Sequence, residues 1–339
     1  MTKSASSTTS AASTPDAAEG GSPLGEVDLL GDSSIWTPEI ERLINAVAAA
    51  FRMGFVGMAV DGLQRCGKSW ACEFLQGTLA DALNYPLATF MWTIPESCKT
   101  ERDFIQERLR ESGCFAGSHR DIAVLRGRLY DHICDSAAQR GGRKVAIIVD
   151  EAHHLTREQY YYLIHTDNSL RLRKVRPFFI LVGQPELRST SSSWMKASGY
   201  QVVGRFFSRQ HRYQGIALAD IQEVVSGFDE PEQGAEVATY AKALPEAYAA
   251  GWRLSHVAPL LVEAIGSIAK RQNITAGVRV PMQSLRAMLL YILFHYIETK
   301  ANPASFSMAV ALQAVDASGF PGVMEYYVHS AEAAQKEAA

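Results

Sequence analysis

The stretch Gly62–Ser69, which reads G-L-Q-R-C-G-K-S, limits the fold of this chain more than any other feature. It fits G-x-x-x-x-G-K-[ST], the pattern of a loop whose backbone N–H groups surround the phosphates of a nucleotide. The apolar run before it predicts a buried strand over Phe55–Asp61, and the residues after it predict a helix over Ser69–Leu83. Strand, glycine loop and helix in this order predict a P-loop in an α/β domain with a parallel sheet.

Each position of the loop has a chemical role in this interpretation. Gly62 and Gly67 lie where the backbone needs glycine, because φ is positive or the chain comes close to the phosphates. Lys68 is expected to reach the β- and γ-phosphates, and the hydroxyl of Ser69 to hold Mg²⁺. Other residues expected to line the nucleotide are Arg65, Cys66 and Trp70.

A second motif, Val145–Glu151, reads V-A-I-I-V-D-E and predicts a strand buried on both faces that ends in two carboxylates. Asp150 is expected to hold Mg²⁺, and Glu151 to polarise the water that attacks the γ-phosphate. Another buried strand is expected over Pro86–Thr93, between the two motifs. We infer that the P-loop strand and the Val145–Glu151 strand are not neighbours and that another strand lies between them, an arrangement typical of P-loop ATPases.

Two further stretches carry candidate catalytic residues. Arg176–Gln184 predicts a fourth buried strand, and Gln184 at its end is either a sensor of the γ-phosphate or a polar cap of the strand. Gly204–Arg212 reads G-R-F-F-S-R-Q-H-R, and an arginine supplied from it to a neighbouring subunit would stabilise the transferring γ-phosphate. Arg205 and Arg209 are both candidates for this role.

The rest of the chain is expected to be mainly helical. A fifth strand is predicted over Tyr213–Leu218, and Arg286 is expected to reach the nucleotide from a helical lid, with Arg279 as its competitor. The expected organisation is a disordered tail over 1–25, an α/β core over 26–218, a helical lid over 219–320 and a flexible tail over 321–339. The helices are predicted over Trp36–Met53, Thr100–Ser112, Arg120–Arg140, Ala219–Phe228, Pro231–Tyr248, Ser255–Arg271, Met282–Thr299 and Ser305–Ala317.

Composition excludes several classes of protein. No apolar run reaches the roughly 18 residues of a membrane span, and the N-terminal stretch lacks the apolar core of a secretory signal, so a cytoplasmic protein is expected. The five cysteines are odd in number and have no C-x-x-C pair, which favours reduced thiols. Cys66 in the loop is either a site where oxidation blocks the nucleotide or a small residue at a permissive position. The net charge of −3 does not indicate nucleic-acid binding, so any DNA contact requires a local basic face.

The motifs together resemble one family. D-E-A-H-H-L at Asp150–Leu155 and L-V-G-Q-P-E-L-R at Leu181–Arg188, followed by G-R-F-F-S-R-Q, resemble the TnsC/TniB group of AAA+ ATPases. These serve transposons with a DDE-type transposase and are similar to the phage Mu target-activator ATPase and to ExeA-type ATPases. The resemblance extends over about residues 36–300.

This resemblance implies a set of roles. Gly67, Lys68 and Ser69 would bind ATP and Mg²⁺, and Asp150 with Glu151 would form Walker B. Gln184 would stand at sensor 1, Arg205 or Arg209 at the arginine finger, and Arg286 near sensor 2. The family further implies homo-oligomeric rings or filaments on duplex DNA that mark a target, receive a TniQ-type targeting protein and recruit the transposase. ATP hydrolysis would then drive disassembly.

The candidate DNA-binding residues are basic side chains, with Lys99 and Arg102 as the first choice and Arg120 next. Another basic cluster comprises Arg171, Arg173, Lys174 and Arg176. The alternative function is an ATPase that acts on a protein partner without DNA, as an ExeA-like assembly or remodelling factor. A metal site at His153 and His154 is not expected, because adjacent histidines should face different directions and no third ligand is spaced nearby.

Overall fold

The computed structural model describes residues 29–31, 35–97, 100–115, 121–232, 234–274 and 277–328. The tail expected to be disordered over 1–25 lies outside these residues. Among the described helices, none is both long enough and apolar enough to cross a membrane.

A five-stranded parallel sheet forms the centre of the fold, with the strand order β2-β3-β4-β1-β5. β4 pairs with β1 on one side and with β3 on the other. The expectation that the P-loop strand and the strand ending in Asp150 are not neighbours is therefore confirmed. The strands are β1 (Gly57–Gly62), β2 (Ala88–Thr93), β3 (Lys144–Asp150), β4 (Arg176–Gly183) and β5 (Gln210–Tyr213).

Alternate side chains of the central strands point to opposite faces of the sheet. Ile148 and Ile180 belong to one apolar cluster, and their neighbours Ile147 and Phe179 to the other. The first cluster contains buried residues of α1 (Pro38–Arg52) and α2 (Lys68–Leu83). The second contains residues of α3 (Glu101–Glu111), α4 (Ile122–Gln139), α5 (Arg157–Leu172), α6 (Glu186–Lys196) and α7 (Tyr200–Val202). The result is a sheet between two helical layers.

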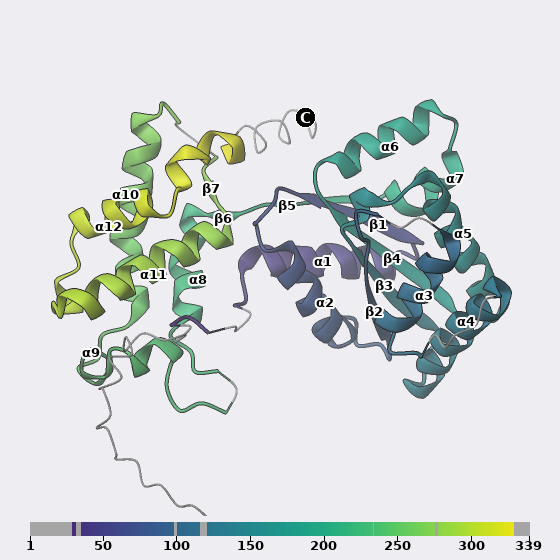
Figure 1. The fold of residues 1–339 in the computed structure, drawn as a ribbon, viewed down its shortest axis with the longest axis horizontal. Coiled ribbons are helices and arrows are strands. Elements are labelled where there is room, and N and C mark those ends of the chain that lie inside the picture. The colour runs from purple at the N-terminus through teal and green to yellow at the C-terminus, as the bar shows by residue number, and fades with distance from the viewer. Residues whose placement is uncertain are drawn as a thin grey trace, which may run out of the picture.

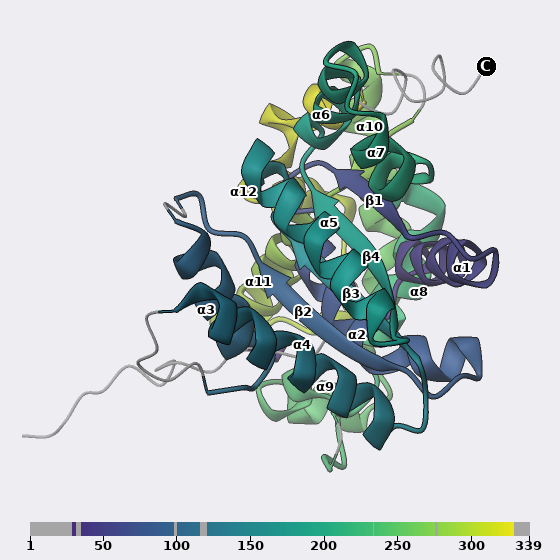
Figure 2. The ribbon, with the colours of Figure 1, turned by 90° about the vertical axis from the view of Figure 1, so that its right-hand side faces the viewer.

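The C-terminal helices lie beside this α/β layer, on the left in Figure 1. Figure 2, turned by 90°, looks along the molecule with the sheet and its helices in front of them. The first apolar cluster continues into this group, because it joins Leu75 of α2 to Leu285 and Leu289 of α11. The helices are α8 (Ile221–Gly227), α9 (Pro245–Ala249), α10 (Ala258–Arg271), α11 (Met282–Thr299) and α12 (Met308–Ala317).

Local sequence explains where the helices begin. Thr37 caps α1 by accepting a hydrogen bond from the backbone N–H of Ile40 at 3.2 Å. α5 begins with a capping box in which Thr156 and Gln159 exchange side-chain and backbone hydrogen bonds. The patterns above did not predict α5 or α6, although the spacing of Thr156 and Gln159 is a signal for a helix start.

Two predictions for the middle of the chain are wrong. The fifth strand is Gln210–Tyr213 rather than Tyr213–Leu218, because β6 (Ile216–Ala217) belongs to a separate two-stranded sheet, in which it pairs antiparallel with β7 (Arg279–Val280). The helix expected over Pro231–Tyr248 is reduced in the described residues to a 3₁₀ turn at Thr239–Lys242 and the short α9. Pro245 explains why the predicted helix is interrupted. A proline is tolerated in the first turn of a helix, where Pro245 stands in α9, but it breaks the interior of a helix.

The C-terminal tail also differs from the prediction. Met324, Tyr327 and Val328 are buried, so the flexible tail expected from residue 321 does not begin there. The hydroxyl of Tyr327 donates a hydrogen bond to the carbonyl oxygen of Gln64 in the P-loop at 3.1 Å. Residues 329–339 lie beyond the part of the chain that the structure describes.

Candidate functional site

The glycine loop leaves β1 and enters α2 as expected. A Cβ on Gly62 would lie 2.4 Å from the carbonyl oxygen of Tyr213, so only glycine fits beside β5. Gly67 has φ +99°, in the left-handed region that favours glycine. The glycines of the motif are therefore explained by a close approach at the first and by backbone conformation at the second.

Lys68 is the buried cation of the loop. Its Nζ donates to the carbonyl oxygen of Leu63 at 2.6 Å. Burial lowers the pKa of Lys68, while the nearby Cys66, Glu151 and Asp150 act in the opposite direction. An ammonium held in this position is ready to exchange a neutral carbonyl for phosphate oxygens.

Ser69 and Asp150 meet at the junction of α2 and β3. The hydroxyl of Ser69 donates to Oδ2 of Asp150 at 3.0 Å. The other carboxylate oxygen, Oδ1, accepts a hydrogen bond from the backbone N–H of Glu151 at 2.8 Å. A hydroxyl beside a carboxylate is the oxygen donor set that suits Mg²⁺, so these two residues fit the metal role predicted for them.

Glu151 follows β3 with φ +53°, in the left-handed region. Its Oε2 lies 3.3 Å from Nδ1 of His153. Burial, followed by the adjacent His154, lowers the pKa of His153, so this contact is made mainly with a neutral imidazole at pH 7.

His153 and His154 do not face different directions, contrary to the prediction from the sequence. The rings of His153 and His154 lie 4.0 Å apart with an interplanar angle of 36°, rather than facing different directions. Glu151 is the third group, and ligand atoms of all three residues lie within 4.8 Å of one another. A metal ion there would occupy the carboxylate that the sequence assigns to catalysis.

Gln184 lies directly after β4 and faces the loop. Its Oε1 accepts a hydrogen bond from Nε2 of Gln64 at 2.8 Å. This contact ties the end of β4 to the P-loop, so Gln184 is placed to respond to what the loop binds. Gln64 is a site residue that sequence reasoning missed, because it stands at a variable position of the motif.

A cleft of about 820 Å³ opens over these residues and is walled by α11. Arg65 donates to Oε1 of Gln283 at 2.9 Å and so bridges the loop to α11. Arg286 lines the cleft and also donates to the carbonyl oxygen of Gly31 at 2.7 Å. Arg279 lies in β7 and lines a different, smaller pocket. The structure therefore brings Arg286 to the cleft, while Arg279 does not line it.

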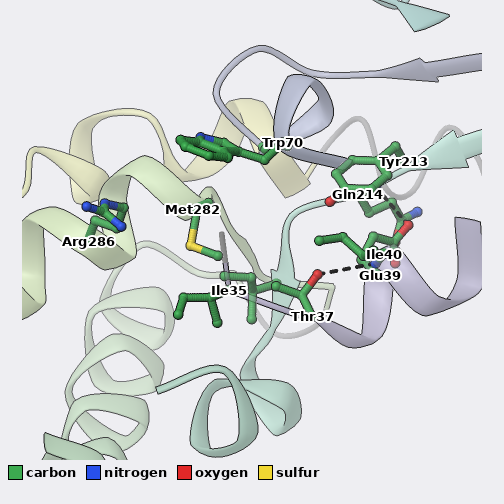
Figure 3. A pocket seen from close by; sticks show the side chains of 12 residues that line it. Ile35, Thr37, Glu39, Ile40, Trp70, Tyr213, Gln214, Met282 and Arg286 are labelled. Atoms are coloured by element: carbon green, nitrogen blue, oxygen red, sulfur yellow. Dashed lines mark hydrogen bonds between the residues drawn. The ribbon is translucent and has the colours of Figure 1, made fainter. Parts of the chain in front are cut away.

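A smaller pocket adjoins the cleft between the start of α1, the loop and α11 (Figure 3). Its volume of about 30 Å³ gives room for little more than a water molecule, so a purine base enters only if its walls move. Trp70 and Arg286 line both the pocket and the cleft. Cys66 also lines the pocket, and burial raises the pKa of its thiol to about 12. This value favours the interpretation of Cys66 as a small buried residue over that of a redox site.

The two candidate arginine fingers lie at the other end of the sheet. Arg209 immediately precedes β5, and its carbonyl oxygen accepts a hydrogen bond from the N–H of Ala59 at 2.9 Å. The carbonyl oxygen of Arg205 lies beside Gly57, the first residue of β1. Gly57 and Ala59 precede Gly62 by about 17 Å and about 10 Å of extended strand. Neither arginine lines the cleft of its own chain.

The surroundings of these two arginines differ. Arg205 lies in a π-helical turn, and its Nε donates to Oδ2 of the buried Asp167 at 3.2 Å. Arg209 is exposed, and its guanidinium lies 5.2 Å from the ring centroid of Phe55 and 3.4 Å from the sulfur of Met53.

Of the predicted DNA-binding residues, Lys99 and Arg120 lie outside the described residues. Arg102 is partly exposed in the first turn of α3. Arg108, on the same helix, is buried, with Nε 2.7 Å from Glu111 and Nη2 donating to the carbonyl oxygen of Thr93 at 2.8 Å. Arg108 therefore holds α3 against β2 and is not available to DNA.

Comparisons with known proteins agree with this geometry. Residues 57–190 match the family model of an AAA domain. The fold is similar to the ORC2 protein of Aeropyrum pernix, solved in ADPNP–ADP complexes, over 86% of this chain and 71% of that chain, with 13% identity and a TM-score of 0.55. It is also similar to Cdc6p of Pyrobaculum aerophilum over 82% of this chain and 67% of that chain, with 11% identity and a TM-score of 0.51. No curated protein sequence matches this chain. Residues 57–190 form an AAA domain, and the chain has the AAA+ P-loop fold with additional C-terminal helices.

Proposed function

We propose that this protein binds ATP with Mg²⁺ and hydrolyses it to ADP and phosphate. The observation that carries the proposal is the contact of Ser69 with Asp150 at 3.0 Å beside the 820 Å³ cleft, into which Glu151 and Gln184 also face. Ser69 and Asp150 would hold Mg²⁺, and the positive charge of the ion would help to neutralise the phosphates. Lys68 would release Leu63 and contact the phosphates.

Glu151 is the proposed general base. It would leave His153, orient a water molecule and accept its proton as the water oxygen bonds to the γ-phosphorus and the bond to the β–γ bridging oxygen breaks. Gln184 would report the γ-phosphate to the loop through Gln64. Arg286 would exchange the Gly31 carbonyl for the nucleotide and so connect its presence to the proposed lid over 219–320.

The same proposal includes assembly with other copies of the chain. Arg205 and Arg209 do not line the cleft of their own chain, and about 10 to 17 Å of strand separates their carbonyls' neighbours on β1 from Gly62. This position fits a hydrolytic site completed by a neighbouring subunit. Arg205 or Arg209 would supply that charge. Oligomerisation and hydrolysis are coupled in this arrangement, because each site is complete only at an interface.

We further propose that assembly takes place on duplex DNA and regulates transposition. The support is the set of motifs from Asp150–Leu155 and Leu181–Arg188 to the arginines after Gly204, which resemble the TnsC/TniB group. In this proposal Lys99, Arg102 and Arg120 contact the DNA backbone without reading its sequence. The assembly marks the target, receives a TniQ-type protein and recruits the transposase, and hydrolysis disassembles it.

Electron microscopy of the purified protein with duplex DNA tests the proposal. Samples with a slowly hydrolysed ATP analogue are compared with samples containing ADP, and Lys68→Ala protein is the control for nucleotide dependence. Rings or filaments on DNA only with the ATP analogue are the expected result. Absence of DNA-dependent assembly in both states would overturn the DNA proposal and favour an ATPase that acts on a protein partner.

A further inference from the structure

A second cleft, of about 450 Å³, lies at the end of the sheet opposite to the P-loop. We call it the basic cleft, because five of its six lining residues carry a positive charge. The six lining residues are Tyr85, Arg143, Lys144, Arg171, Lys174 and Arg176. Since the chain as a whole has a net charge of −3, this concentration of cations does not follow from its composition.

Four elements bring these cations together. Lys144 and Arg176 are the first residues of β3 and β4 and pair directly in the parallel ladder. The N–H of Arg176 donates to the carbonyl oxygen of Arg143 at 2.8 Å, which fixes the segment that follows α4. Arg171 lies in the last turn of α5, and Lys174 follows that helix with φ +65°. The cleft is therefore built on strand starts and helix ends rather than on a long loop.

Most of this charge has no acidic partner. Arg171 donates from Nε to Oδ1 of the buried Asp167 at 2.5 Å. Within the described part of the chain, no ion pair joins Arg143, Lys144, Lys174 or Arg176 to a carboxylate.

Two features of the fold hold these cations together without neutralising them. The ammonium of Lys144 lies 4.4 Å from the ring centroid of Phe51 and 5.7 Å from that of Tyr85. Helices α2, α4 and α5 all end near the cleft, and the partial negative charge of helix C-termini reduces the repulsion among the cations. The side-chain N–H groups of these lysines and arginines therefore remain available to a ligand.

We infer that the basic cleft is a binding site for phosphate groups, separate from the P-loop. Guanidinium groups bind phosphate through two parallel hydrogen bonds, and ammonium groups bind it as point charges. Five cations around 450 Å³ exceed what one carboxylate would need and suit several phosphates in a row. Either the backbone of a nucleic acid or a soluble oligophosphate supplies that chemistry.

The test compares two double variants of the full chain. Lys174→Gln/Arg176→Gln removes two exposed cations of the cleft. Lys270→Gln/Arg271→Gln is the matched control, because it removes two exposed cations in the last turn of α10. Thermal unfolding of both variants verifies that they fold.

The first arm measures tripolyphosphate binding by calorimetry, with Lys68→Ala in every protein so that the P-loop does not contribute. We expect the cleft variant to lose about tenfold or more in affinity at 0.1 M salt, and the control to change less than twofold. Binding that survives Lys68→Ala also separates this inference from the proposed function, because the latter requires an intact P-loop. Equal affinities in the cleft variant and the control would overturn the inference.

The second arm identifies the source of the phosphates. Binding of a fluorescent duplex is measured with an intact P-loop and a saturating ATP analogue. If the backbone of DNA occupies the cleft, the cleft variant binds the duplex about tenfold more weakly, and the slope of log affinity against log salt concentration falls by roughly two. If duplex binding is unchanged while tripolyphosphate binding is lost, the ligand is a soluble oligophosphate. If the cleft variant loses neither duplex binding nor tripolyphosphate binding, the proposed site is refuted.

Discussion

Mixing two inactive variants tests whether a neighbouring chain completes each hydrolytic site. One variant is Glu151→Gln, which keeps its arginines but lacks the proposed base. The other is Arg205→Ala/Arg209→Ala, which keeps its base but lacks both candidate fingers. If Arg205 and Arg209 act on the site of a neighbouring chain, each variant retains the half of the interface that the other lacks.

The expected magnitude follows from counting interfaces. Loss of the base slows hydrolysis by about 10²- to 10⁴-fold, and loss of a finger by about 10³- to 10⁵-fold, so each variant alone is nearly inactive. In a random equimolar mixture, about one interface in four joins an intact loop with its Glu151 to an intact pair of arginines. The mixture should therefore recover up to about a quarter of the wild-type rate, which is far above the sum of the rates of the two variants measured separately.

Steady-state phosphate release, measured at a protein concentration that supports assembly, is the assay. A mixture of Glu151→Gln with Lys68→Ala is the matched control, because no interface in it has an intact loop and base. Arg205 pairs with the buried Asp167, so thermal unfolding of the double variant must show that it remains folded. Mixed assemblies that form without recovering activity would refute completion of the site by a neighbouring chain.

Four further outcomes follow from the site. Lys68→Ala should weaken ATP binding by about 100-fold in a calorimetric titration, and unchanged affinity would contradict the P-loop assignment. Glu151→Gln should bind ATP normally while phosphate release slows by at least about 100-fold, and normal turnover would exclude Glu151 as the base. Trp70 is 42% exposed at the cleft, so its fluorescence should change on nucleotide addition, and Trp70→Phe should abolish that change. Burial raises the pKa of Cys66 from 9.0 to about 12, so iodoacetamide at pH 8 should modify this thiol about a thousandfold more slowly in the folded than in the unfolded protein. The rate of modification in the folded protein should rise about tenfold per pH unit towards pH 12. Equal rates in the folded and unfolded protein would contradict the burial of Cys66.

Residues whose chemistry depends on local spacing were predictable from the sequence. The motif from Gly62 to Ser69 predicts a glycine loop, and the apolar run before Asp150 predicts a strand buried on both faces. Both Ser69 and Asp150 were expected to hold Mg²⁺, and the structure brings the Ser69 hydroxyl to 3.0 Å from the Asp150 carboxylate.

Residues whose position depends on distant packing were not predictable in the same way. Gln64 meets Gln184 and Tyr327 only because the end of β4 and the C-terminal segment both reach the loop. Arg108 reads as a surface cation, but Glu111 one helical turn later pairs with it inside the fold. The basic cleft combines helix ends with strand starts, and no single stretch of sequence contains it.

The hydrogen bond from Tyr327 to Gln64 also sets an order of events during synthesis. These residues are 263 positions apart, so Gln64 has left the ribosome long before its partner is made. The P-loop of a growing chain therefore lacks a contact that the finished protein has. The loop proposed to bind ATP is therefore incompletely supported in the nascent chain, and it gains this contact only after the C-terminal helices have been translated.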